Sequence, residues 1–506
     1  MALISVFFFF LFTTLGLGLI YLSQVYLKLS AFKKNSVIME YASENGIKLG
    51  FSHVAELISQ AASPTVITEP HWGELRENAR AGGLRTLEEA LGSNLPIEIE
   101  ETGEDQTWHA LIHFSRDTFS DRGGYFLADF KGTIDSEGSL INFTQKKKSG
   151  LDVSLKVAAG HVPLAYFPFL LAGVSDPGRI ADLKEKQKIV FMAPAQNQIF
   201  PQMNYSADQL ISPDVTALLG ETLKIKILSP QNLTRAELRT ALGLDMVNEP
   251  VPDGVYLVRN NTGLGGIYVQ GDLDALLLAV ESDFQVVSFS SKTGTWVLKY
   301  SPAQSKTQFR TPGEFYSWDR IPLSILMVNG KIDSLGAGIV EADGDVVPSP
   351  EIETPCILQG LSLTIVSADQ ITLTSDLIHQ GVKWMNGIPY LKDSQSQLIV
   401  FANGRDFFDA VDKAGKIVIS PNAPQNVKIQ ASLTARDAFD IPGKQKTVFI
   451  TGGLQTSNLA LNENILKIAP DERLLKNSLL PKNSPETSLP LLFILSLRAT
   501  NWKEYE

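Results

Sequence analysis

Four residue pairs in this sequence have the types and the spacing that could support chemistry. Three are pairs of aspartates, and the fourth is a pair of histidines. They are Asp272 with Asp274, Asp343 with Asp345, Asp369 with Asp376, and His109 with His113. Two carboxylates that face one groove at about 5–10 Å can hydrolyse a glycosidic bond, and two histidines on one helix face can bind a metal ion. The elements that carry these residues decide whether either chemistry is available.

The elements predicted around these pairs favour structural roles. The stretch Asp343-Gly344-Asp345 is typical of a turn, and Asp369 and Asp376 each follow a predicted strand. At such corners an aspartate accepts hydrogen bonds from backbone N–H groups. The two histidines lie in an alternating, strand-like segment, which would hold them ~13 Å apart. We therefore expect no catalytic residue, no cofactor-binding residue and no metal ligand.

Glycine and cysteine patterns add no catalytic signal. No phosphate-binding Gly-Lys-Ser/Thr loop, His-Glu-x-x-His or Gly-x-Ser-x-Gly occurs. The glycines of 263–266 lack the spacing of a dinucleotide-binding turn and precede a predicted strand. Cys356 is the single cysteine, so no disulfide can form within the chain. We expect it to be a buried, small apolar side chain.

Length and charge set the class of protein. With 506 residues the chain has room for an anchor and two or more domains. Its 44% hydrophobic and 20% charged residues are typical of a globular protein. A net charge of −11 argues against a general nucleic-acid binder, which needs a concentrated basic face. The basic triplet 146–148 is interpreted as a solvated loop.

The amino terminus is the element around which the rest is organised. No residue from Ala2 to Leu27 is charged, and about 20 apolar helical residues cross the ~30 Å hydrocarbon layer. The run continues directly into Lys28 without the short apolar core and cleavage site of a secretory signal. We predict a membrane anchor, with an uncleaved or unusual signal peptide as the alternative.

The anchor is predicted to continue as an amphipathic helix outside the bilayer. Apolar residues follow it largely at spacings of three and four. They are Leu29, Phe32, Ile38, Tyr41, Ala42, Phe51, Val54, Ala55 and Ile58. Pro64 is expected to mark the end of the helix. A chain that begins near Pro64 is therefore expected to be soluble without detergent.

This plan, a helix half in lipid and half packed on a globular body, resembles that of a type IV pilin-like subunit. The residues that carry the resemblance to the amino-terminal segment of PilX-type minor pilins are Ala2-Leu3-Ile4, Gly16, Gly18-Leu19-Ile20-Tyr21-Leu22-Ser23-Gln24 and Tyr41-Ala42-Ser43-Glu44-Asn45-Gly46. The family usually has a Glu at the fifth position of the mature chain, where this sequence has Ser5, and a short basic leader ending in Gly. We expect either a start further upstream or a relative that is not processed.

The resemblance also implies how the helix would associate. Helices inside lipid approach one another through small residues, and the small cluster of this span is Thr13, Thr14, Gly16 and Gly18. We expect this face to bind other pilin-like subunits or a pilus assembly platform. Because Ser5 replaces the usual Glu, the chain is expected to be a poor major subunit and to act at low copy as an initiating or accessory component.

The charge bias around the span conflicts with the orientation that the resemblance implies. Lys28, Lys33 and Lys34 follow the span, and nothing basic precedes it in this sequence. By the positive-inside rule this asymmetry favours a cytoplasmic body, whereas a pilin-like body lies outside the cytoplasm. A basic leader upstream would remove much of the conflict.

Residues 63–250 are predicted to form a mixed α+β region. A capped helix is expected from Thr86 to Leu91, with Gly92 after it. Strands are expected at 108–114, 125–130 and 151–157, and a buried or docking segment at 162–174. A capping box at 234–237 predicts a second helix that runs to Leu242 before Gly243.

Residues 251–470 contain short β-rich runs that resemble one another. The runs are 266–273, 325–332, 363–369, 370–377, 398–404, 416–420, 427–433 and 447–454. Each is closed by Gly, Asn, Asp or Ser, which favours stacked coils of a β-helix or β-solenoid with a Val/Ile/Leu interior. Ile365 and Val418 are predicted to point inward. A β-sandwich with similar strand lengths is the alternative.

Residues 251–506 also resemble the uncharacterised β-solenoid-like domain that follows PilX-type anchors in bacterial proteins. The shared motifs are Ser367-Ala368-Asp369, Thr374-Ser375-Asp376-Leu377, Ala402-Asn403-Gly404, Ala431-Ser432-Leu433-Thr434-Ala435 and Phe449-Ile450-Thr451-Gly452-Gly453-Leu454-Gln455. Asp471-Glu472-Arg473 and Trp502-Lys503-Glu504 are similar to the closing turn and final strand of that family. We therefore assign 471–506 to a C-terminal tail with a final strand.

The sequence as a whole predicts a mainly β protein with an N-terminal transmembrane pilin-like helix (1–62), a mixed α+β region (63–250) and a β-helix or solenoid-like domain (251–470). The expected function is that of a non-enzymatic, membrane-anchored minor pilin-like or pilus-assembly-associated protein. Its partners would be membrane lipid and pilin-like subunits, with no nucleic acid and no cofactor. It would be a single-pass protein of the bacterial inner membrane or envelope, its body outside the cytoplasm. The alternatives are an anchored β-helix enzyme acting on polysaccharide, and a bitopic envelope protein unrelated to pili.

Overall fold

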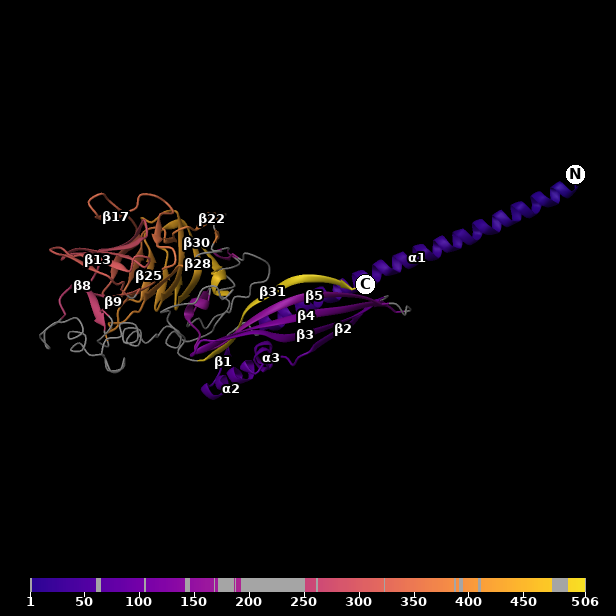
Figure 1. Ribbon diagram of the computed structural model, residues 1–506, viewed down its shortest axis with the longest axis horizontal. Helices are drawn as coiled ribbons and strands as arrows, with labels where there is room; N and C mark the ends of the chain where they lie inside the picture. The colour runs from indigo at the N-terminus through magenta and orange to yellow at the C-terminus, as the bar shows by residue number, and fades with distance from the viewer. Residues whose placement is uncertain are drawn as a thin grey trace.

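The computed structural model has three parts: a long N-terminal helix, an antiparallel sheet packed on that helix, and a larger β-rich body (Figure 1). The residues that it describes are 2–60, 65–103, 106–141, 146–167, 169–171, 186, 188–192, 251–260, 263–322, 324–385, 388–390, 395–407, 411–475 and 490–505. The protein is mostly β with a long apolar helix at its amino terminus, as the sequence predicted. The helix predicted at 234–242 lies outside the described residues.

Helix α1 runs without interruption from Ala2 to Gln60. Its 59 residues rise by about 1.5 Å each, which gives a rod of ~89 Å. Its first half projects away from the rest of the molecule, and its second half lies along the first sheet (Figure 1). The predicted continuation of the N-terminal apolar helix into the globular part is therefore confirmed. Pro64, the predicted terminator, lies outside the described residues.

The first sheet is antiparallel throughout, in the order β1-β31-β5-β4-β3-β2. Its strands are β1 (Thr65–Val66), β2 (Ile97–Thr102), β3 (Gln106–Asp121), β4 (Tyr125–Leu140), β5 (Lys146–Gly160) and β31 (Leu491–Tyr505). The three strands predicted for this region lie within β3, β4 and β5. Two short helices, α2 (Glu69–Arg80) and α3 (Arg85–Leu91), share one apolar core with the second half of α1 and this sheet. The helix predicted from Thr86 is α3, and it ends at Gly92 in the left-handed conformation as expected. The predicted cap is wrong, because the N-cap is Leu84 and the Thr86 hydroxyl donates to the carbonyl oxygen of Leu75.

The body is inserted between two neighbouring strands of the first sheet. Strand β5 ends at Gly160, β31 begins at Leu491, and these two residues are paired in the sheet. The chain therefore leaves the sheet, builds the body and returns beside the strand that it left. The final strand was predicted, but its place in the sheet beside β5 was not.

The body contains two large sheets, which we call the second and third sheets. The second contains β6 (Phe169–Leu171), β7 (Ile189–Phe191), β8 (Gly254–Asn260), β9 (Gly263–Gln270), β15 (Ile325–Asn329), β19 (Ser362–Ser367), β24 (Gln397–Ala402), β26 (Asn426–Ala435), β28 (Lys444–Thr456) and β30 (Glu463–Pro470). The third contains β10 (Ala275–Glu281), β11 (Phe284–Ser291), β12 (Gly294–Ser301), β13 (Lys306–Arg310), β14 (Phe315–Trp318), β16 (Ile332–Val340), β17 (Val346–Pro348), β20 (Ile371–Leu373), β25 (Lys416–Ile419), β27 (Ala438–Asp440) and β29 (Leu459–Ala460). Smaller elements are η1 (Leu164–Tyr166), α8 (Glu472–Leu475), the pair β18 (Pro355–Ile357) and β21 (Ile378–His379), and the pair β22 (Lys383–Met385) and β23 (Ile388–Tyr390).

From β9 to β29 the chain alternates between the second and third sheets. Strands β9, β15, β19, β24, β26 and β28 pair in parallel in the second sheet. The strands that follow them, β10, β16, β20, β25, β27 and β29, pair in parallel in the third. Strands β11 to β14 extend the third sheet as an antiparallel meander. Each of the eight β-rich runs predicted from the sequence contains a strand.

Register brings apolar side chains of the second sheet into line between the two sheets. One row consists of Ile267, Leu326, Ile365, Val400, Leu433 and Leu454, each paired with the next and all buried. In the third sheet Ile417 and Ile419 are buried in the same core. The prediction that Val418 points inward is wrong, because it lies between these two residues and side chains alternate along a strand.

A second apolar core joins the body to the first sheet. The outer face of the first sheet contributes Tyr125, Leu127 and Phe493, which pack with Met327 and Phe401 of the second sheet. The predicted docking segment is buried here as far as it is described, from Val162 to Phe167. The Phe167 ring stacks on that of Phe493 with 4.7 Å between centroids. The body is therefore attached to the sheet by packing as well as by the chain.

A charge placed in the inward row should unfold the body. We expect Ile365→Asp to lower the free energy of unfolding by more than about 4 kcal/mol, because it buries an unpaired carboxylate. Val418→Asp is the matched control, and its half-exposed position predicts a loss of about 1 kcal/mol. Urea unfolding of the detergent-solubilised chain measures both. Equal losses would contradict the assignment of the two faces.

Candidate functional site

In its described positions 12–34, helix α1 is apolar and has no described part of the protein packed around it. From position 12 to position 34 only Gly16 is even partly covered, and the exposed side chains include Leu19, Tyr21 and Leu27. Within the described residues, α1 is the one helix long and apolar enough to cross a membrane, and none of its most apolar window is buried. An exposed apolar surface of this size is not tolerated by a soluble monomer. The helix is thus suited to insertion in lipid or to association with other helices.

The second half of α1 buries one face against the first sheet. Buried positions recur at spacings of one, three and four residues, as one side of a helix requires. They are Met39, Ala42, Ser43, Gly46, Ile47, Gly50, Val54 and Ile58. Of the residues predicted for this face, Ala42, Val54 and Ile58 are buried, whereas Leu29, Phe32 and Tyr41 are exposed.

Glycines allow this helix to approach the sheet closely. A Cβ atom on Gly46 would lie 2.1 Å from Ser136 Oγ, and one on Gly50 would lie 2.8 Å from Ile134 Cγ2. On the sheet side, a Cβ atom on Gly138 would lie 2.4 Å from the carbonyl oxygen of Met39. The close packing of these glycines was not predicted from the sequence, although Ala42, Gly46 and Gly50 are spaced four residues apart. That spacing of small residues on one helix face was the available signal.

The four residues predicted to mediate helix association lie in the exposed half of α1 but not on one face. In an α-helix, Thr13 and Gly16 are neighbours, as are Thr14 and Gly18, because residues three or four apart lie side by side. Gly16 and Gly18 are two residues apart and therefore point to different sides. A Cβ atom on either glycine would meet nothing within 4 Å. The helix offers two separate small pairs instead of one cluster.

The aspartates considered for catalysis bind backbone N–H groups at the corners of the body. Asp376 accepts hydrogen bonds from the N–H groups of Glu353 and Lys428, at 3.0 and 2.9 Å. Asp369 Oδ1 accepts from the N–H groups of Gln370 and Ala414. The predicted corner role is confirmed for both. Burial raises the pKa of Asp376, against the lowering effect of its two backbone donors.

The other candidate side chains also have structural surroundings. Asp272 accepts from the N–H of Lys331, and Asp343 accepts from the N–H of Asp345 within the predicted turn. Cys356 is fully buried, as predicted, and burial raises the pKa of its thiol to about 12. In the described part of the chain, no group of three or more His, Cys, Asp or Glu side chains could hold a metal ion.

The outer face of the first sheet has a polar groove of about 640 Å³ that contains His113. Polar side chains join neighbouring strands along this face. His113 is hydrogen-bonded to Asp135 at 2.9 Å, and ion pairs join Lys131 with Asp117 at 2.8 Å and Lys503 with Asp152 at 2.6 Å. His109 and His113 lie on strand β3, as predicted, and not on a helix. The charges of this face therefore serve cross-strand pairing.

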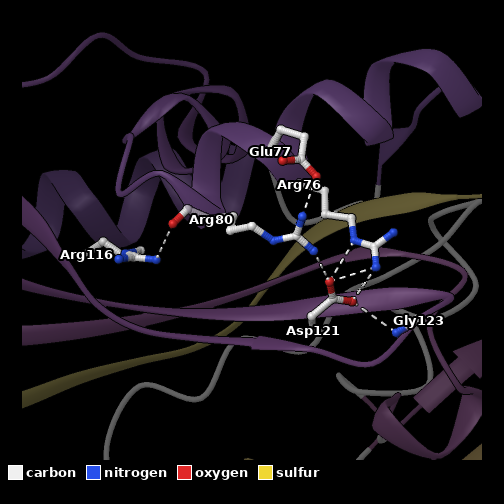
Figure 2. Close-up of polar contacts among 6 residues, drawn as sticks. All are labelled: Arg76, Glu77, Arg80, Arg116, Asp121 and Gly123. Carbon is white, nitrogen blue, oxygen red and sulfur yellow. Dashed lines mark hydrogen bonds and ion pairs between the residues drawn. The ribbon is translucent and has the colours of Figure 1, made fainter.

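A cluster of arginines around Asp121 fixes α2 to the end of β3 (Figure 2). Asp121 accepts hydrogen bonds from Arg76 Nε at 2.9 Å, from Arg80 Nη2 at 2.7 Å and from the N–H of Gly123 at 3.0 Å. Arg116 donates to the carbonyl oxygen of Ala79 near the end of the same helix. Burial of Asp121 opposes ionisation, but the Gly123 N–H and the two guanidinium groups outweigh it and hold the pKa below its usual value. The pairing therefore stabilises the fold at neutral pH and is lost only in acid.

Comparison with known proteins gives little. No protein-family model matches the sequence, and no curated protein matches it. A solved structure, that of the competence-associated pilin ComZ from Thermus thermophilus, is similar over 93% of this chain and 98% of its own at 10% identity, with a TM-score of 0.24. A similarity at that score carries no argument about fold or function.

The packing of α1 corrects the expectation that a chain beginning near Pro64 is soluble. Such a chain would lack the helix face that fills the core of the first sheet, and it would expose Ile112 and Ile134, which are fully buried in the complete chain. We expect a chain beginning at Asn35 to be soluble and monomeric without detergent, and one beginning at Thr65 to aggregate. Size-exclusion chromatography distinguishes them. A monomeric, cooperatively folding chain from Thr65 would contradict this account of the helix.

Proposed function

We propose that this chain is a membrane-anchored, non-enzymatic minor pilin-like or pilus-assembly-associated protein of the bacterial envelope, with its body outside the cytoplasm. One observation carries the proposal. A single helix is exposed and apolar in its first half, and its second half packs against an antiparallel sheet. Because the helix is continuous, it fixes the position of the folded part relative to the membrane or to a bundle of similar helices. Membrane lipid and other pilin-like subunits are its proposed partners.

The non-enzymatic part of the proposal is supported by the use of the polar side chains. The carboxylate oxygens of the aspartates that suggested a glycosidase accept hydrogen bonds from backbone N–H groups. A glycosidase needs one carboxylic acid and one carboxylate presented to the same sugar. The ion pairs in the groove of the first sheet likewise join strands to each other. Display and assembly are functions that require no such groups.

We further propose that the body is a short β-solenoid used as a rigid spacer. Support comes from the repeated passage of the chain from the second sheet to the third, from the parallel pairing of the strands involved, and from the continuous apolar row through Ile365. Stacked coils need no partner beyond their neighbours, so such a body can project a surface away from the membrane. The meander of β11 to β14 then extends the third sheet beyond the first strand of the stack, β10.

The association of α1 with other helices is proposed to use one of its two small pairs. Gly16→Leu enlarges the side that carries Thr13, and Gly18→Leu enlarges the side that carries Thr14, so each variant is the control for the other. We expect one of them to weaken association with pilin-like subunits in a membrane two-hybrid assay by about tenfold or more, because close approach of helices in lipid depends on small residues. Insertion of both should be unchanged.

Three results would count against the proposed function. Association of both variants at wild-type strength would remove the small pairs from the interface. Recovery of no pilin-like partner by the wild-type chain would favour the alternative of a bitopic envelope protein unrelated to pili. Release of polyuronide fragments or other sugars by the purified chain would favour the anchored polysaccharide-acting enzyme.

A further inference from the structure

A group of lysines lies on α1 and on the nearby end of the first sheet, and the pilin-like plan does not explain its role. Three follow the apolar run on α1, and three begin strand β5. They are Lys28, Lys33, Lys34, Lys146, Lys147 and Lys148, which together we call the juxtamembrane basic face. The triplet was interpreted from the sequence as a solvated loop, but its residues are paired with Glu137, Gly138 and Ser139 of β4.

Contacts between α1 and β4 place this face relative to the membrane. Gly50 lies over Ile134, Gly46 over Ser136, and Gly138 against Met39 and Ser43. Residues of β4 with higher numbers therefore lie beside residues of α1 with lower numbers. At about 3.3 Å per strand residue and about 1.5 Å per helix residue, the end of β4 is level with about residue 36 of α1. The β4 end is thus within one helical turn of Lys33 and Lys34.

Helix length then sets the distance between these residues and the headgroups. The uncharged run 2–27 is ~39 Å long, about 9 Å more than the hydrocarbon layer. Residue 36 lies ~14 Å beyond the end of that run. With the excess seated on the far side, the hydrocarbon ends near Leu27, and the end of β4 stands ~14 Å from it, about 7 Å outside the headgroup layer. The length of a lysine side chain and the Debye length of about 10 Å together span that gap. The next residue, Ile141, is apolar and 46% exposed.

The charge of this face is complementary to anionic lipid. Lys28, Lys33 and Lys34 are exposed and form no ion pair within the described residues. Lys146 and Lys148 share a single carboxylate, that of Glu137, which leaves a positive excess. Side-chain hydrogen bonds from these two lysines hold the pKa of Glu137 below its usual value. Lysines close to a membrane surface attract anionic headgroups over about one Debye length.

We propose that the juxtamembrane basic face binds the anionic phospholipid headgroups around the anchor and holds the first sheet close to the membrane surface. The contact is continuous with the span of α1. It limits tilting of the body relative to the membrane, since the sheet and the body share an apolar core. This inference rests on the membrane anchor of the proposed function and is independent of the pilus role.

The test uses the full chain with a fluorophore at position 141. Because Cys356 is fully buried, the variant Ile141→Cys offers one reactive thiol. The labelled chain is inserted in nanodiscs of phosphatidylcholine alone or mixed with phosphatidylglycerol, each containing a headgroup-labelled quencher lipid. We expect quenching at position 141 in the mixed discs, and its loss at high ionic strength. A label at Ile352→Cys, exposed on the loop after β17 in the body, should stay unquenched.

Charge variants separate specific contact from general attraction. Lys28, Lys33 and Lys34 changed together to Gln should abolish the quenching at position 141. Lys292, Lys416 and Lys444 changed to Gln remove the same charge from exposed sites in the body and should leave it intact. Absence of quenching at position 141 in the inserted chain, or quenching that ignores lipid charge and the first triple variant, would overturn the proposal. A chain that does not insert would overturn the anchor of the proposed function and this contact with it.

Discussion

The close approach of α1 to the first sheet is the contact on which the rest of the structure depends. Gly46 and Gly50 on the helix and Gly138 on β4 leave no room for a side chain between backbone and sheet. Because of this contact, one helix belongs both to the exposed apolar segment and to the folded core. Enlarging any of these glycines would force the elements apart, at a cost typical of overpacking, about 1–3 kcal/mol.

The insertion of the body extends the same constraint over the whole chain. The body begins and ends at two paired strands of the first sheet, and it shares an apolar core with the outer face of that sheet. Interfaces between domains of one chain are usually more polar and permit relative motion. Here buried aromatic side chains such as Phe167, Phe401 and Phe493 fill the junction. The orientation of the anchor helix therefore sets the orientation of the body, and the body can act as a rigid extension of the helix.

Much of this architecture could be predicted because its signals are local. The uncharged run 2–27, the period of the strands and the corner positions of Asp369 and Asp376 depend on neighbours in sequence, and the structure confirms them. Longer-range features were not accessible. Neither β31 nor β5 contains a sequence pattern that indicates their pairing. The direction of the Val418 side chain is also not fixed by the sequence, because a shift of one residue along a strand turns every side chain to the opposite face. Thr13, Thr14, Gly16 and Gly18 were grouped by their nearness in sequence, whereas helical geometry separates them into two pairs. The proposed function depends on partners, which the fold alone does not specify.

The most direct test of the account is a cross-link between the helix and the sheet. Ser43 on α1 and Ser149 on β5 are buried with their hydroxyl oxygens 2.8 Å apart, and the single native cysteine is buried elsewhere. The account predicts that the full chain with Ser43→Cys and Ser149→Cys forms an internal disulfide under mild oxidation, leaving one free thiol after denaturation. Ser43→Cys with Ser154→Cys, which lines the groove on the outer face of the sheet, should form none. Three free thiols in the first variant after oxidation would contradict the claim that the anchor helix is part of the folded core.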